Sequence, residues 1–116
     1  MGEEVFLFEP DLLFSSRIES AAIKSGLAVR VIVTTNELQR ALQASVPRLL
    51  LVDLDALAGS SLLGLLKGPW KLVGYYSHAD SKLASQALAC GFNMVIPRRS
   101  FVDQLNEIFA NIGSSG

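Results

Sequence analysis

Five short runs of apolar residues alternate along this chain with longer segments whose apolar residues recur at helical spacing. The apolar runs cover residues 4–8, 27–34, 48–53, 71–76 and 93–96. A helix-like segment follows each of them, at 11–26, 35–45, 60–67, 79–91 and 100–113. The runs are continuously apolar, which is typical of strands that helices cover on both faces. The alternation therefore predicts an α/β fold, a doubly wound parallel sheet built from five strand–helix units.

Residues that commonly start or stop helices flank most of these segments. Glycines at 26, 91 and 113 are placed to end helices. Predicted N-caps are Thr35 or Asn36 for the second helix, Asp80 or Ser81 for the fourth, and Ser100 for the last. The third segment is short and closes at Gly68-Pro69, so we expect a helix of only a turn or two there.

Length and composition narrow the class of protein. A chain of 116 residues, half of them hydrophobic, is enough for a single domain spanning residues 1–116. The net charge of −1 gives no basic excess for nucleic acid, and no apolar stretch is long enough to span a membrane. With acids in place of a signal peptide's bases and a single cysteine, Cys90, we expect a cytoplasmic protein without an internal disulfide. The lone histidine, His78, is expected to be solvated rather than part of a zinc site.

Polar residues follow four of the five predicted strands. They are Glu9 and Asp11 after the first, Asp53 and Asp55 at the end of the third, Tyr76 and Ser77 at the end of the fourth, and Arg98 and Arg99 after the fifth. In a parallel sheet these positions share one edge, and doubly wound sheets bind their ligands at that edge. The sequence therefore predicts a functional site there.

Structural roles compete with this interpretation. Asp53 and Asp55 could simply end a strand with local backbone hydrogen bonds, and Glu9 could be a solvated strand end. Asp11 is expected to cap the first helix rather than to bind a metal. No glycine-rich phosphate loop and no nucleophile elbow occur in the chain, which argues against a nucleotide-binding protein and against an enzyme.

The whole arrangement resembles the receiver domain of bacterial response regulators (CheY-like), over essentially the full chain. The resemblance implies a flavodoxin-like fold with strand order 2-1-3-4-5 and a role in two-component signalling. It places Asp53 at the phosphoacceptor position, with Glu9 and Asp53 as metal-binding acids. It places Tyr76, or Ser77 one residue later, at the phosphoryl-binding hydroxyl position, and Arg98 at the position of the usual lysine.

Several departures from the family pattern coincide in this chain. The second acid position holds Pro10, and Asp11 lies one residue late. The hydroxyl position holds a tyrosine, Arg98 replaces the lysine, and the aromatic switch position holds Val95. The chain thus resembles the atypical receivers, or pseudo-receivers, in which the phosphoryl site is altered. With fewer carboxylates, Mg²⁺ binding is expected to be weak, because this ion gives up its water reluctantly.

The resemblance implies a stand-alone signalling module that acts through a protein partner, either a histidine kinase or a second copy of the chain. The expected surface is the fourth helix, fifth strand and fifth helix, within residues 79–113. Two alternatives stay open: a working receiver phosphorylated on Asp53, and a flavodoxin-like domain that binds a small ligand. We further expect Arg98 to pair directly with Asp53 and to lower the pKa of that carboxyl group.

Overall fold

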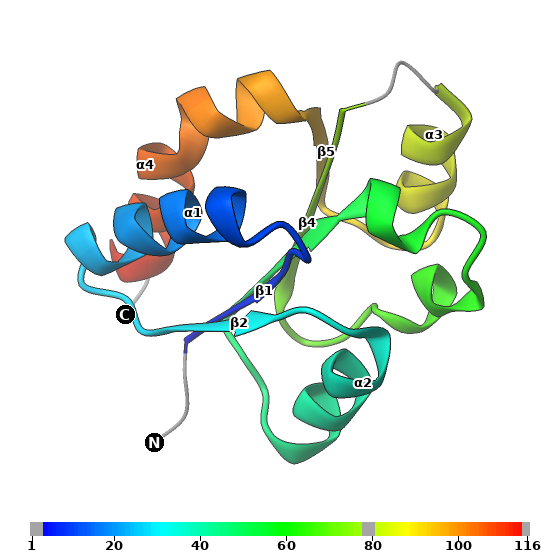
Figure 1. Ribbon diagram of the computed structural model, residues 1–116, viewed down its shortest axis with the longest axis horizontal. Coiled ribbons are helices and arrows are strands. Elements are labelled where there is room, and N and C mark those ends of the chain that lie inside the picture. The colour runs from blue at the N-terminus through cyan, green and yellow to red at the C-terminus, as the bar shows by residue number, and fades with distance from the viewer. Residues whose placement is uncertain (1–3, 78–80, 115–116) are drawn as a thin grey trace.

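The computed structural model describes residues 4–77 and 81–114. Five parallel strands form one sheet in the order β2-β1-β3-β4-β5, with helices on both faces (Figure 1). The predicted flavodoxin-like fold and strand order are confirmed. His78 and the predicted cap Asp80 lie outside the described residues. No helix in the described ranges is long and apolar enough to cross a membrane.

The apolar runs form the strands, with shorter bounds than expected for the second. The strands are β1 (Val5–Phe8), β2 (Val29–Ile32), β3 (Leu49–Asp53), β4 (Lys71–Tyr76) and β5 (Met94–Pro97). The α-helices are α1 (Leu12–Lys24), α2 (Thr35–Ala44), α3 (Ser81–Ala89) and α4 (Arg98–Ser114). The third helix-like segment, residues 60–67, forms no α-helix and contains only a short 3-10 helix, η2 (Ser61–Leu65). A second 3-10 helix, η1 (Leu54–Leu57), lies before it and directly follows β3. The predicted reduction of the third helix is confirmed.

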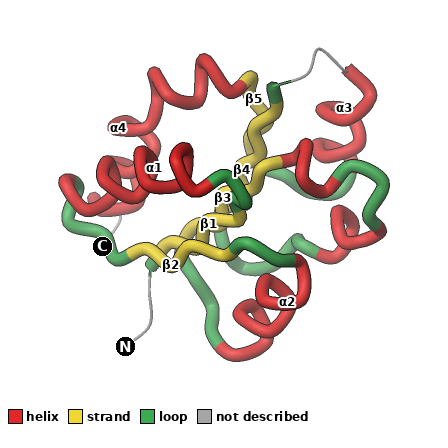
Figure 2. The backbone as a smooth tube through the Cα atoms, in the orientation of Figure 1, coloured by secondary structure: helices red, strands yellow, loops and turns green. Residues whose placement is uncertain are grey.

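The sheet separates two apolar cores. Helices α1 and α4 cover one face, and α2, η1, η2 and α3 cover the other (Figure 2). Successive strand residues point to opposite faces, so Leu49 and Leu51 pack toward α1 and α4 while Leu50 and Val52 pack toward the other layer. The same alternation directs the residues at the strand ends, which decides which side chains of the candidate site can meet.

Two predicted helix starts are wrong. Helix α2 is capped by Thr34 and not by Thr35 or Asn36: its hydroxyl accepts from the Glu37 N–H at 3.1 Å. The Glu37 carboxylate in turn accepts from the Val33 N–H at 3.2 Å, so a reciprocal pair of bonds fixes the start of α2. Helix α4 begins at Arg98, directly after β5, which places the predicted cap Ser100 inside the first turn.

Candidate functional site

Three strands bring their carboxyl ends together around two acids and a tyrosine. Strands β1 and β3 pair with Phe8 opposite Val52, so Glu9 and Asp53 are the next residues in that register. On the other side of β3, Asp53 pairs with Tyr75 of β4. Because side chains alternate along each strand, Glu9, Asp53 and Tyr75 all point toward the face that α1 and α4 cover. The register alone therefore gathers the two acids and the phenol.

Glu9 is buried, with 1% of its surface exposed, so the expectation of a solvated strand end is wrong. Its Oε1 accepts a hydrogen bond from the Tyr75 hydroxyl at 2.7 Å, and its Oε2 accepts one from the Asp11 N–H at 3.0 Å. Burial, with the charge of Glu9 nearby, raises the pKa of Tyr75, so the phenol keeps its proton and donates it. Each oxygen of Glu9 thus has a donor supplied by the fold itself.

Asp53 ends β3 and is half buried. Its Oδ1 accepts from the Asp55 N–H at 3.1 Å, so it caps η1, and the local structural role considered above is present. Burial raises the pKa of Asp53 to about 7, with further contributions from a hydrogen bond to Glu9 and from the charges of Glu9 and Asp55. The expected lowering of this pKa is therefore wrong, and near pH 7 the Asp53 carboxyl group is protonated in part of the molecules.

Asp55 connects this acid pair to the end of β4. Its Oδ2 accepts hydrogen bonds from the Ser77 hydroxyl at 2.6 Å and from the Ser77 N–H at 2.8 Å. The Tyr76 side chain is half buried and packs against the core on the α2 and α3 side, and no hydrogen bond of its hydroxyl occurs within residues 4–77 and 81–114. Of the two residues proposed for the hydroxyl position, Ser77 is the one with a hydrogen bond to an acid of this edge, Asp55.

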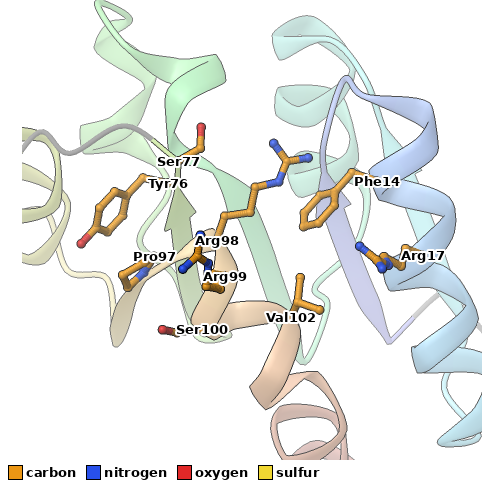
Figure 3. Close-up of a pocket in the computed structure, with 9 residues that line it drawn as sticks. All are labelled: Phe14, Arg17, Tyr76, Ser77, Pro97, Arg98, Arg99, Ser100 and Val102. Carbon is orange, nitrogen blue, oxygen red and sulfur yellow. The ribbon is translucent and has the colours of Figure 1, made fainter.

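Arg98 does not pair with Asp53, and this prediction is wrong. Its Nη2 lies 3.6 Å from Oδ2 of Asp11, and its guanidinium carbon lies 3.6 Å from the centre of the Phe14 ring. Figure 3 shows the side chain running from the start of α4 toward Phe14 on α1. The planar guanidinium stacks on the aromatic face, a contact that the usual lysine would make less well.

Asp11 is the N-cap of α1, as expected. Its Oδ1 accepts from the N–H groups of Leu13 and Phe14, at 3.0 and 3.3 Å. Since its other oxygen faces Arg98, both oxygens of this exposed carboxylate are engaged. Asp11 is therefore directed toward the helix and the arginine, and not toward Glu9 and Asp53.

The donor set does not fit a resident Mg²⁺ ion. Such an ion needs several oxygens free to point at one centre. Glu9 is bonded at both oxygens, Asp53 caps η1, and Asp11 caps α1. Within the described parts of the chain, no group of three or more His, Cys, Asp or Glu side chains is placed to hold a metal.

Similarity to known proteins is found at the level of structure. No family model matches the sequence, and no curated protein matches it. A response regulator from Thermotoga maritima superposes with a TM-score of 0.81 at 19% identity, covering 98% of this chain and 99% of that one. The phosphorylated cyanobacterial phytochrome response regulator RcpA gives 0.76 at 21% identity, covering 97% and 91%. The orphan response regulator HP1043 of H. pylori gives 0.74 at 17%, covering 95% and 92%. This chain has the receiver fold.

On the receiver fold, the predicted site residues separate into two groups. Glu9 and Asp53 lie together, and Asp55 joins them to Ser77. Arg98 and Asp11 form a second group, in which the Arg98 guanidinium packs against the Phe14 ring. The sequence interpretation missed Tyr75 as a partner of the acids. A tyrosine within a fully buried strand needs a hydrogen-bond partner for its hydroxyl. That requirement could have indicated from the sequence that Tyr75 bonds one of the acids.

Proposed function

We propose that this chain is a receiver-type signalling module of the two-component kind that acts by binding another protein in the cytoplasm, and that it is not an enzyme. Its phosphoryl and metal site is altered so that it no longer works as a Mg²⁺-dependent switch. The fold shared with response regulators supports the general class. The arrangement around Glu9 supports the altered site.

Glu9 carries this proposal. The Glu9 carboxylate is 1% exposed and already accepts a donor on each oxygen, so a hydrated cation has to compete there with the Tyr75 hydroxyl and the Asp11 N–H. Leaving the buried Tyr75 hydroxyl unpaired costs about 1–3 kcal/mol. Mg²⁺ binding at this site therefore competes with two hydrogen bonds that belong to the fold.

The neighbouring positions support the same conclusion. Pro10 has no side-chain ligand for a metal at the second acid position. Arg98, at the position of the usual cation, is occupied by Asp11 and Phe14. A phosphoryl group on Asp53 would lack both the metal and the nearby cation that normally neutralise its charge.

The partner surface that we propose is formed by α3, β5 and α4, the elements that correspond to the expected fourth helix, fifth strand and fifth helix. Along α3, small residues such as Ala84 accompany the exposed Leu88, and Lys82 is the one charged residue. Low charge and exposed apolar area suit close packing against another protein, either a kinase or a second copy of this chain. Light scattering at increasing protein concentration tests the second copy, since Leu88→Glu should abolish any dimer.

The phosphoryl switch is tested by NMR with Mg²⁺ and beryllofluoride, which mimics a phosphoryl group on the acceptor aspartate. We expect no saturable Mg²⁺ binding below millimolar concentration and only small amide shifts around Asp53. The double variant Pro10→Asp, Tyr75→Phe is the matched comparison, because it restores a second acid and frees one oxygen of Glu9. Its Mg²⁺ affinity should rise at least several-fold.

Saturable binding of Mg²⁺ at micromolar concentration, with large beryllofluoride-dependent shifts near Asp53, would contradict the altered site. The chain would then be a working receiver phosphorylated on Asp53, which is the alternative that the position of Asp53 at the end of β3 favours.

A further inference from the structure

A hollow near the site that contains Glu9, Asp53 and Asp55 is lined by three arginines. It has a volume of about 680 Å³ and lies between α1, the ends of β4 and β5, and the first turn of α4. Arg17 reaches it from α1, and Arg98 and Arg99 reach it from α4 (Figure 3). We call it the arginine hollow. None of its lining residues within the described chain carries a carboxylate, and Asp53 does not line it.

The positive charge of the arginine hollow is only partly balanced. Arg98 has Asp11 as its ion-pair partner, at 3.6 Å. Arg17 and Arg99 are exposed, and neither makes an ion pair within residues 4–77 and 81–114. The whole chain carries a net charge of −1, so this concentration of guanidinium groups is local. Like charges on a concave surface raise the potential inside it and attract an anion.

Other groups at the arginine hollow suit an anion as well. The first turn of α4 borders it, and the N–H groups of a first helical turn have no acceptor within their own helix. The hydroxyl of the half-buried Ser100 lies on the same turn. The positive end of the dipole of this 17-residue helix adds to the charge of the arginines.

We propose that the arginine hollow binds a small ligand that carries two phosphate groups, of the diphosphate type. The planar guanidinium fork matches two oxygens of one phosphate, so arginines on opposite walls can each hold one phosphate of a pair. The volume lies in the range of roughly 300–1,000 Å³ that small-ligand sites occupy. This binding is non-covalent and needs neither Asp53 nor a metal, so it goes beyond the signalling role proposed above.

The test is a titration of the isotope-labelled protein with sodium pyrophosphate, without Mg²⁺ and at constant ionic strength. We expect saturable shifts of the backbone amides of Arg17, Ser77 and residues 98–102, with a dissociation constant below millimolar. Inorganic phosphate should bind at least tenfold more weakly. A comparison of ADP with adenosine tests whether the diphosphate of a nucleotide is also bound. Binding of ADP without binding of adenosine would show that the phosphate groups, and not the base and sugar, are recognised.

The double variant Arg17→Gln, Arg99→Gln should weaken pyrophosphate binding at least tenfold, whereas Arg40→Gln, an exposed arginine on α2, should change it less than twofold. Both substituted side chains in the double variant are exposed, so we expect it to fold, and its amide spectrum checks this in the same experiment. Equal weakening by Arg40→Gln, shifts that do not saturate, or tight binding of an acidic peptide without binding of pyrophosphate would overturn the proposal. A failure here leaves the beryllofluoride result untouched, so the two proposals are tested separately.

Discussion

Tyr75 and Glu9 link β4 to β1 through a single hydrogen bond in the interior of the protein. The Tyr75 side chain is fully buried, stacks on Phe101 with ring centres 4.3 Å apart, and donates its hydroxyl to Glu9. Tyr75→Phe keeps the ring contacts and removes only this donor. We expect the free energy of unfolding to fall by about 1–3 kcal/mol, since Glu9 loses a bond that water cannot replace.

Tyr76→Phe is the matched control for this substitution. The Tyr76 hydroxyl has no hydrogen-bond partner in the described residues, so chemical denaturation should show a change of less than about 0.5 kcal/mol. Equal losses for the two variants would show that the Tyr75–Glu9 bond contributes nothing specific.

The carboxyl group of Asp53 makes stability depend on pH. Its pKa is raised to about 7 in the folded protein, while an unfolded aspartate has a pKa of about 3.9. The folded state therefore binds the extra proton, and the stabilisation is fully present below pH 4 and lost as the pH rises through 7. Because Asp53 is only half buried, solvent screening limits the loss to about 1–2 kcal/mol.

Asp53→Asn isolates this effect because the amide carries no charge at any pH. The variant should be more stable than the original protein at pH 8, and the two should converge toward pH 4, as measured by urea denaturation across that range. Asp103→Asn, which changes an exposed aspartate on α4, serves as the control. A stability difference for Asp53→Asn that stays constant from pH 4 to 8 would contradict the raised pKa of Asp53.

The sequence predicted which residues belong to this site better than it predicted the contacts between them. The strand ends were sufficient to place Glu9 and Asp53 at one edge, because sheet register requires it. The partner of Arg98 was not predictable in this way, because so long a side chain can reach several different partners. Arg98 contacts the Phe14 ring on α1 and Asp11, the N-cap of α1, and their distance from Arg98 depends on how α1 and α4 pack.

At the scale of the elements, β4 must approach η1 closely, and Gly74 permits it. A Cβ atom added at Gly74 would lie 2.9 Å from Cγ of Leu54 and 3.0 Å from a ring carbon of Phe92. Both neighbours are buried and have little room to move. We expect Gly74→Ala to lower the free energy of unfolding by about 1–3 kcal/mol in chemical denaturation, through overpacking.

Gly64→Ala provides the comparison, since a Cβ atom at Gly64 in η2 meets nothing within 4 Å. That variant should stay within about 0.5 kcal/mol of the original protein. A neutral Gly74→Ala would mean that η1 shifts freely against the sheet.

The elements themselves followed from the sequence, and their ends did not. Continuous apolar runs identified all five strands, because strands covered on both faces have no polar side to expose. The start of α4 was misplaced by three residues, since Ser100 as N-cap puts the first helical residue at 101, whereas β5 passes into the helix at Arg98 without a connecting loop. A serine is a common cap only where a loop precedes the helix, and here Ser100 already lies in the first turn.

At the scale of the whole molecule, two cores share one sheet. A substitution that destabilises one core should therefore destabilise the other as well. Ile108 is buried between α4 and the sheet, whereas Trp70 packs on the opposite face. Ile108→Ala should cost about 2–5 kcal/mol, and the urea midpoint seen by Trp70 fluorescence should fall together with the midpoint seen by circular dichroism.

Leu13→Ala is the control for this experiment, because the Leu13 side chain is 87% exposed and should contribute little. A Trp70 transition that does not move in Ile108→Ala would mean that the two faces unfold independently, and the expectation of a single domain would fail.

The strand order also has a consequence for the rate of folding. Every neighbouring pair in β2-β1-β3-β4-β5 is parallel, so no pair can form as a local hairpin, and each must wait for an intervening segment to cross over. The central pairing of β1 with β3 joins residues about forty positions apart, from Val5 to Leu49 at its start. Sheets of such long-range contacts fold slowly for their size, and during that delay the five apolar strands are exposed to other chains. Refolding yield should therefore fall with protein concentration well before equilibrium stability does.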